Sequence, residues 1–217
     1  MFKKSILATL LLVSTSAFAS PVNLSFISTN TTKYTQLSVN GSNLNTSIGS
    51  YNLNIAGVST VGFCVDPFQW ASGITSSYEK SSLDASDFAS GNGATRFANA
   101  QKLYDNAYAG LSGSTQTAGF HLALWEIFHG DLNTASGNIQ KTMWSDAGMI
   151  SLANGFLSNL GSWGTTNAYD LTFYGSGRYQ DFLVAKPSAV PVPAALPLLA
   201  SGLIGFVALR RRKANQA

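Results

Sequence analysis

The chain has 217 residues, of which 11% are charged, and a formal net charge of +3. Six basic residues lie at the two ends of the chain, namely Lys3, Lys4, Arg210, Arg211, Arg212 and Lys213. Without them, residues 20–189 hold 7 basic and 10 acidic side chains, a net charge of about −3. Nucleic-acid-binding domains need a basic face on their folded part, so this composition excludes a nucleic acid as the partner. About 170 residues remain between the ends, which is enough for one domain with a hydrophobic core.

The N-terminal segment, residues 1–19, has the layout of a secretory signal peptide. Its two lysines form a positive start, and residues 6–13 form an apolar stretch. Ala17 and Ala19 then supply the A-x-A pattern of a cleavage site. We therefore expect signal peptidase to cut after Ala19 and the domain that follows to be exported across the inner membrane.

The C-terminal end has three parts in order. Residues 187–193 form a proline-containing spacer, residues 194–209 an apolar run and residues 210–217 a basic tail. At 1.5 Å per residue the apolar run makes a helix of about 24 Å, which flanking residues can extend toward the ~30 Å of a bilayer core. This pattern predicts one transmembrane helix over residues 194–209. The positive-inside rule places the basic tail in the cytoplasm and the domain outside.

This C-terminal layout resembles the PEP-CTERM sorting signal of Gram-negative bacteria. The resemblance rests on a short proline motif and an arginine-rich end, namely Val190, Pro191, Val192, Pro193, Arg210, Arg211 and Arg212. The glutamate that gives the motif its name is replaced by Val192. The resemblance implies processing by an exosortase-type enzyme, a membrane-anchored intermediate, and delivery to the cell surface or extracellular matrix. The partner there would be an extracellular polysaccharide or another surface polymer.

Between the ends, the pattern of apolar residues changes twice. It predicts strands, then three helices, then two more strands. Asn40 and Gly41 form a dipeptide typical of a tight hairpin turn. We expect strands at residues 22–26, 34–39, 51–55 and 58–65, helices at 94–109, 115–128 and 146–160, and strands at 169–174 and 180–185. This order indicates an α+β domain over residues 20–186, with an antiparallel sandwich or barrel-like sheet and an inserted helical region.

The four tryptophans divide into two pairs. Trp125 and Trp144 lie on apolar helical patterns and are expected in the core. Trp70 and Trp163 lie beside serine and glycine turns, where an exposed indole could stack on a sugar ring. The pattern thus leaves a sugar-binding role open for the second pair.

The only cysteine, Cys64, cannot form a disulfide within the chain. It is expected either as a buried apolar thiol or as half of a reactive pair with His121, whose ring Asp66 or Glu126 could orient. The other histidine, His129, ends a predicted helix, where a cation would interact favourably with the helix dipole. One cysteine and two histidines at wide spacing make a poor zinc site, and we expect no metal and no cofactor.

Two segments resemble the paired motifs of bacterial thioester domains, namely Phe63-Cys64-Val65-Asp66 and Phe120-His121-Leu122-Ala123-Leu124-Trp125-Glu126-Ile127. In that family a strand cysteine and a helix glutamine lose ammonia and form an internal thioester, which captures a nucleophile. The resemblance implies a thioester-domain-like fold. In this chain His121 stands at the position of the glutamine, and Gln116 is the alternative amide.

Three functional hypotheses follow. The first is an adhesive or structural protein of the extracellular polymer layer or biofilm, which is not an enzyme. The second is a covalent adhesin with single-turnover thioester chemistry at Cys64. The third is a Cys-His hydrolase or transferase that acts at the cell surface.

Overall fold

The computed structural model describes residues 20–88 and 92–189. The predicted signal peptide with Ala17 and Ala19 lies outside these residues. So do the sorting motif, the transmembrane helix predicted over residues 194–209, and the basic tail. Within the described residues, no helix meets the length and hydropathy that a membrane span requires.

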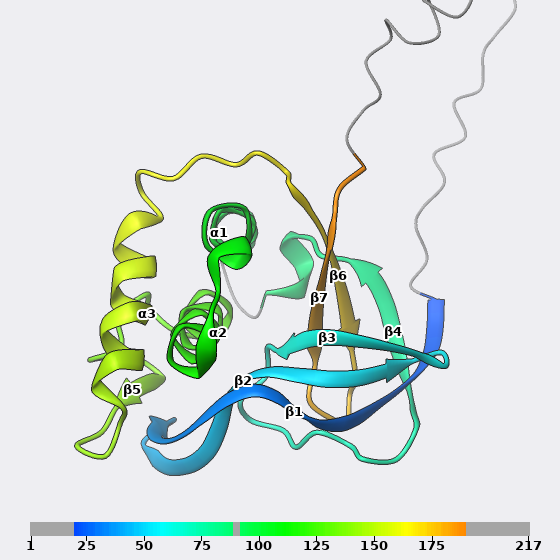
Figure 1. The fold of residues 1–217 in the computed structure, drawn as a ribbon, viewed down its shortest axis with the longest axis horizontal. Helices are drawn as coiled ribbons and strands as arrows, with labels where there is room; N and C mark the ends of the chain where they lie inside the picture. The colour runs from blue at the N-terminus through cyan, green and yellow to red at the C-terminus, as the bar shows by residue number, and fades with distance from the viewer. Residues whose placement is uncertain (1–19, 89–91, 190–217) are drawn as a thin grey trace, which may run out of the picture. The chain divides into compact units, whose positions relative to one another are not determined.

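In the described part of the chain, seven strands form one antiparallel sheet. They are β1 (Ser20–Val39), β2 (Ser42–Ile55), β3 (Val58–Cys64), β4 (Ser76–Ser82), β5 (Ile139–Lys141), β6 (Tyr169–Gly175) and β7 (Phe182–Pro187). The strand order is β2-β3-β7-β6-β4-β1-β5, and β1 also pairs with β2, so six strands form a closed ring of pairings (Figure 1). β5 pairs with the C-terminal end of β1, outside this ring.

The first hairpin is confirmed. Asn40 and Gly41 have φ values of 50° and 77°, and β1 and β2 pair on either side of them. β1 is longer than predicted, because residues 27–33 continue the pairing with β2 through two register irregularities. β4 was not expected, since its sequence SSYEKSS contains one buried side chain, Tyr78, and no clear alternation.

Three α-helices lie in sequence between β4 and β6, which are neighbours in the sheet, so the α+β class is confirmed. They are α1 (Gly93–Ala107), α2 (Gly113–His129) and α3 (Ala147–Asn159), with short 3₁₀ turns at Ala85–Asp87 and Tyr108–Gly110. Every residue of α2 from Thr117 to Phe128 is buried. This follows from its position, because α2 contacts α1, α3, β1 and β2. A helix that is enclosed on every side needs an apolar surface all round, as this one has.

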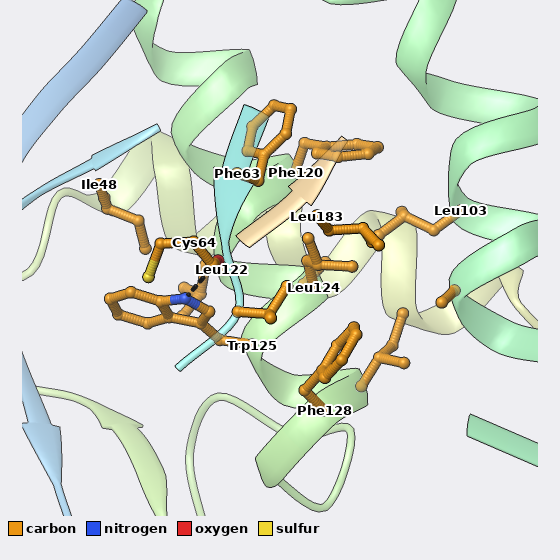
Figure 2. Packing of buried hydrophobic residues seen from close by; sticks show 14 of the residues in the cluster. Ile48, Phe63, Cys64, Leu103, Phe120, Leu122, Leu124, Trp125, Phe128 and Leu183 are labelled. Atoms are coloured by element: carbon orange, nitrogen blue, oxygen red, sulfur yellow. Dashed lines mark hydrogen bonds between the residues drawn. The ribbon is translucent and has the colours of Figure 1, made fainter. Parts of the chain in front are cut away.

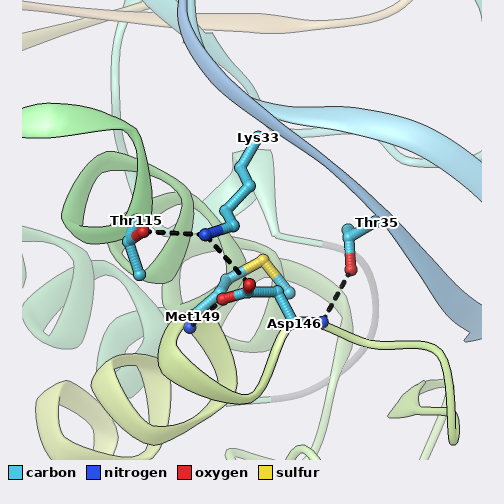
Figure 3. A network of polar contacts seen from close by, with 5 residues as sticks. All are labelled: Lys33, Thr35, Thr115, Asp146 and Met149. Atoms are coloured by element: carbon cyan, nitrogen blue, oxygen red, sulfur yellow. Dashed lines mark hydrogen bonds and ion pairs between the residues drawn. The ribbon is translucent and has the colours of Figure 1, made fainter.

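A polar network fixes the start of α3 to β1 and α2 (Figure 3). The Asp146 carboxylate accepts the Met149 N–H at 2.8 Å and caps α3, while the Asp146 N–H donates to Thr35 Oγ1 at 3.2 Å. Lys33 Nζ lies 2.9 Å from Asp146 Oδ2 and donates to Thr115 Oγ1 at 2.9 Å. The Met149 N–H, followed by Lys33, lowers the pKa of Asp146, so the cap remains charged at neutral pH.

The structure corrects one of the tryptophan expectations. Trp125 is buried as predicted, but Trp144 is 70% exposed, because it lies in the loop before the α3 cap rather than on the helix. Trp70 is exposed, as its turn context predicted. Trp163 is only partly exposed and packs against the core.

The crossing of α2 and α3 depends on Gly119. A Cβ at this position would lie 2.8 Å from the Leu152 Cβ and 3.1 Å from the Met149 carbonyl oxygen. Gly119→Ala is therefore expected to force the helices apart and to lower the free energy of unfolding by about 1 to 3 kcal/mol. Urea denaturation of the purified protein measures this change.

The matched control is Gly155→Ala on the open face of α3, where a Cβ would meet no atom within 4 Å. It should raise stability by up to ~1 kcal/mol, because alanine favours a helix over glycine. Equal effects of the two substitutions would contradict a close contact between α2 and α3 at Gly119.

Candidate functional site

Cys64 is the last residue of β3, and its thiol is fully buried (Figure 2). The thiol donates a weak hydrogen bond to the Asp66 carbonyl oxygen, with an S–O distance of 3.5 Å. Burial raises the pKa of Cys64 well above its ordinary value. The thiol is therefore protonated at neutral pH and is a poor nucleophile in this state.

His121 projects from α2 and lies between two backbone groups of the sheet. Its Nδ1 accepts the Gly49 N–H at 2.8 Å, and its Nε2 lies 2.5 Å from the Cys64 carbonyl oxygen. A nitrogen that accepts from a backbone N–H carries no proton, so the proton is on Nε2, which donates to Cys64. Burial lowers the pKa of His121 to about 3. The ring is neutral, and both of its nitrogens are occupied.

Gly49 in β2 makes this contact possible. Its φ is 149°, and a Cβ there would collide with the Thr31 carbonyl oxygen of β1. β1 and β2 therefore approach closely at this point, next to the register irregularity between Thr29 and Thr32. Sequence reasoning missed Gly49, although an isolated glycine in a strand pattern often marks such an approach.

Two further ring N–H groups of α2 point to the same end of β3. Trp125 Nε1 donates to the Cys64 carbonyl oxygen at 3.0 Å, and His129 Nε2 lies 2.6 Å from the Val65 carbonyl oxygen. His121, Trp125 and His129 are spaced by four residues, so they lie along one face of the helix. We call these three side chains the donor seam. They join α2 to the backbone where β3 ends.

The expectation of a cation at His129 is wrong. Burial lowers the pKa of this histidine, and its ring packs edge-on against Phe68 with 5.1 Å between ring centroids. The neutral ring donates to a carbonyl group of the sheet. Its contribution is thus a hydrogen bond between elements rather than a charge at the helix end.

Of the other candidate residues, none joins the contact between Cys64 and His121. Gln116 Oε1 accepts from the Ser112 N–H at 2.8 Å and from the Ser112 hydroxyl at 3.0 Å, so its amide closes the start of α2. Asp66 Oδ1 accepts the Phe68 N–H at 2.8 Å. The imidazole is thus oriented by backbone groups, and its contact with Cys64 runs to the backbone carbonyl oxygen, with no carboxamide taking part.

Glu126 is a buried carboxyl group that sequence reasoning named only as a possible partner of His121. Its side chain has no exposed surface and lies against Gly130, where a Cβ would collide with it. Neither carboxyl oxygen reaches hydrogen-bond geometry with any described residue, although the N–H groups of residues 131–133 lie close and favour its charged form. Burial, and then the Asp131 carboxylate, raise the pKa of Glu126 to about 7. This carboxyl is therefore partly protonated at neutral pH.

The described residues contain no group of three or more His, Cys, Asp or Glu side chains that could hold a metal ion. Comparison with known proteins gives no further assignment, since no family model, no curated protein and no solved structure matches the chain. The geometry of the site therefore defines its chemistry. That geometry is a protonated thiol and a neutral imidazole, both held by backbone groups.

Three buried groups, His121, His129 and Glu126, make stability depend on pH, and the raised pKa of Glu126 acts against the lowered pKa values of both histidines. His121, with a lowered pKa, costs stability as pH falls from 6.5 toward 3, and Glu126, with a raised pKa, costs stability as pH rises from 4.5 to about 7. Their effects oppose each other between pH 4.5 and 6.5. Glu126→Gln removes the Glu126 contribution. The free energy of unfolding of this variant, relative to that of the wild type, should therefore rise by roughly 3 kcal/mol from pH 4.5 to pH 7.

The measurement is urea denaturation of both proteins at half-unit pH steps. The wild type should lose less stability on acidification from pH 6.5 to 4.5 than Glu126→Gln does, because in the wild type Glu126 offsets part of the loss that the two histidines cause. Glu79→Gln, at an exposed position of β4, is the matched control and should follow the wild-type curve. Parallel curves for the wild type and Glu126→Gln would contradict a buried carboxyl group with a raised pKa at this position.

Proposed function

We propose that this chain is an exported protein of the cell surface or extracellular matrix, sorted by an exosortase-type system. Its folded domain then serves as an adhesive or structural part of the extracellular polymer layer, without catalytic turnover. The observation that carries this proposal is the combination of an export signal at residues 1–19 with the three-part C-terminal segment at residues 187–217.

The processing route follows from the same two segments. Signal peptidase cuts after Ala19, and the transmembrane helix predicted from the sequence of residues 194–209 holds the intermediate in the inner membrane of a Gram-negative cell. An exosortase-type enzyme then acts near the motif of residues 190–193. The substitution of glutamate by Val192 leaves the cut position for experiment to define.

Within the α+β class, we propose a thioester-domain-like fold for the domain. Its support is that His121, at the family's glutamine position, donates to the backbone carbonyl oxygen of Cys64 at the end of a strand. The neutral His121 ring offers one acceptor and one donor, as a carboxamide would. An imidazole has no acyl group to transfer to the thiol, however, so the contact favours a non-covalent module.

The two alternatives need different chemistry at Cys64. A covalent adhesin needs an amide within reach of the thiol, and Gln116 is instead bonded at the start of α2. A Cys-His enzyme needs a thiolate and a free imidazole nitrogen, whereas both nitrogens of His121 are bonded to the backbone. The adhesin is the second candidate, because α2 places the residue at the family's glutamine position beside Cys64.

The test is the intact mass of the protein recovered from its native surface, treated with a thiol alkylator or with methylamine. We expect a chain that begins at Ser20 and ends near Pro193, because both processing enzymes have acted. Since Cys64 is buried, alkylation should be complete in denaturant and slow in native buffer, and no ammonia should be missing from the mass. Cys64→Ala should change stability but not attachment to the surface.

Replacing Arg210, Arg211 and Arg212 together by serine is the control for sorting, and this variant should retain its C-terminal tail. Recovery of wild-type surface protein with its C-terminal tail intact would contradict the sorting proposal.

The same mass spectra test the chemistry at Cys64. Loss of ammonia that methylamine reverses would establish the covalent adhesin. His121→Gln tests the fold assignment, because a carboxamide at this position should form the thioester if the site resembles the family's.

A further inference from the structure

A cavity of about 110 Å³ lies beside the loop that follows β3. The residues that line it come from β2, from this loop, from α2 and from the segment before β7, and none of them is charged. They include Thr46, Gln69, Trp70, Trp125 and Gln180. Trp125 belongs to the donor seam, so the cavity has a rigid wall on the helix side.

Trp70 is the most exposed of these side chains, with 79% of its surface accessible. Its backbone is nevertheless fixed, because the Trp70 carbonyl oxygen accepts the Gln180 N–H at 3.2 Å. Two residues later, the Ser72 carbonyl oxygen accepts the Phe26 N–H at 2.8 Å. The loop therefore holds a large aromatic face in water on an ordered backbone, and such preorganisation favours binding.

Gln69, the neighbour of Trp70, adds a polar group to the cavity. Its Oε1 is buried, and no described residue donates a hydrogen bond to it. A buried acceptor without a partner destabilises a fold, so it calls for a donor from a ligand or from water. The Thr46 hydroxyl also lines the cavity and can donate or accept.

We propose that this cavity binds one sugar unit of an uncharged polysaccharide. The apolar C–H face of the sugar stacks on Trp70, and one of its hydroxyl groups donates to Gln69 Oε1. This inference rests on the proposed function, because a protein of the polymer layer meets such chains.

Three features favour this ligand class over others. An apolar peptide or lipid would leave Gln69 Oε1 without a donor, and an ionic group would find no counter-charge among the lining residues. The volume equals that of roughly four waters and is well below the ~300 Å³ of typical small-molecule sites. This volume is smaller than a whole sugar ring, so the cavity takes the hydroxyl edge of one unit, while the ring lies on Trp70 and the rest of the polymer lies across the surface beside it.

The experiment is affinity electrophoresis of the full chain, purified in a detergent without a sugar head group. Native gels contain dextran, laminarin or galactomannan as neutral polymers, or alginate as an anionic one. We expect at least one neutral polymer to retard the wild type. Trp70→Ala should weaken this binding tenfold or more, and Gln69→Ala should weaken it less.

Trp144→Ala is the matched control, because Trp144 is also exposed (70%) but does not line the cavity. It should bind as the wild type does. Circular dichroism and the urea midpoint should show that Trp70→Ala is folded, since the indole makes little contact with the core. Tryptophan fluorescence of the wild type should change on binding, and that change should be absent from Trp70→Ala.

The proposal would be overturned if no neutral polymer retarded the wild type, or if alginate alone did so. It would also be overturned if a neutral polymer retarded the wild type and Trp70→Ala equally. The mass experiment on processing distinguishes this failure from failure of the proposed function. A chain that is cut near Pro193 but binds no neutral polymer would remain a sorted surface protein without this site. A chain that binds the polymer but keeps its C-terminal tail would support the sugar-binding cavity and contradict the proposed exosortase-type processing.

Discussion

The donor seam is the interaction on which the rest of the structure depends. Three ring N–H groups of α2 satisfy the carbonyl groups of Cys64 and Val65, just where β3 ends. This fixes the central helix to the sheet, and α1 and α3 pack around it. It also fixes the start of the loop that carries Trp70, so the proposed sugar-binding cavity is positioned by the same contacts that hold the core.

The seam requires neutral side chains, and burial provides them. Enclosure lowers the pKa of both histidines and raises that of Cys64, so each remains uncharged at neutral pH. Glu126, on the same helix, is partly protonated for the same reason. The Cys64 thiol is thus protonated, and both nitrogens of the His121 ring are bonded to the backbone. This supports a structural or adhesive role over a catalytic one.

Sequence reasoning identified the elements that have strong local signals. The apolar periodicity of α2 and α3, and the Asn40-Gly41 turn, predicted their structures correctly. The sequence patterns did not predict β4, because this strand depends on its pairing partners. They also did not predict the exposure of Trp144, because it depends on the neighbouring elements. The resemblance to thioester domains brought Cys64 and His121 together, but no pattern could show that the contact runs through a backbone carbonyl. The contact of Gly49 with His121 likewise joins segments far apart in the sequence.

The most direct test of this account is the protonation state of His121, measured by nitrogen NMR of the labelled full chain. The account predicts a proton on Nε2 and none on Nδ1, and the ring should remain neutral at about pH 5, far below its ordinary pKa of 6.5. A proton on Nδ1, or titration of the ring near pH 6.5, would contradict the donor seam. Either result would mean that α2 is joined to β3 in another way and that His121 is available for chemistry.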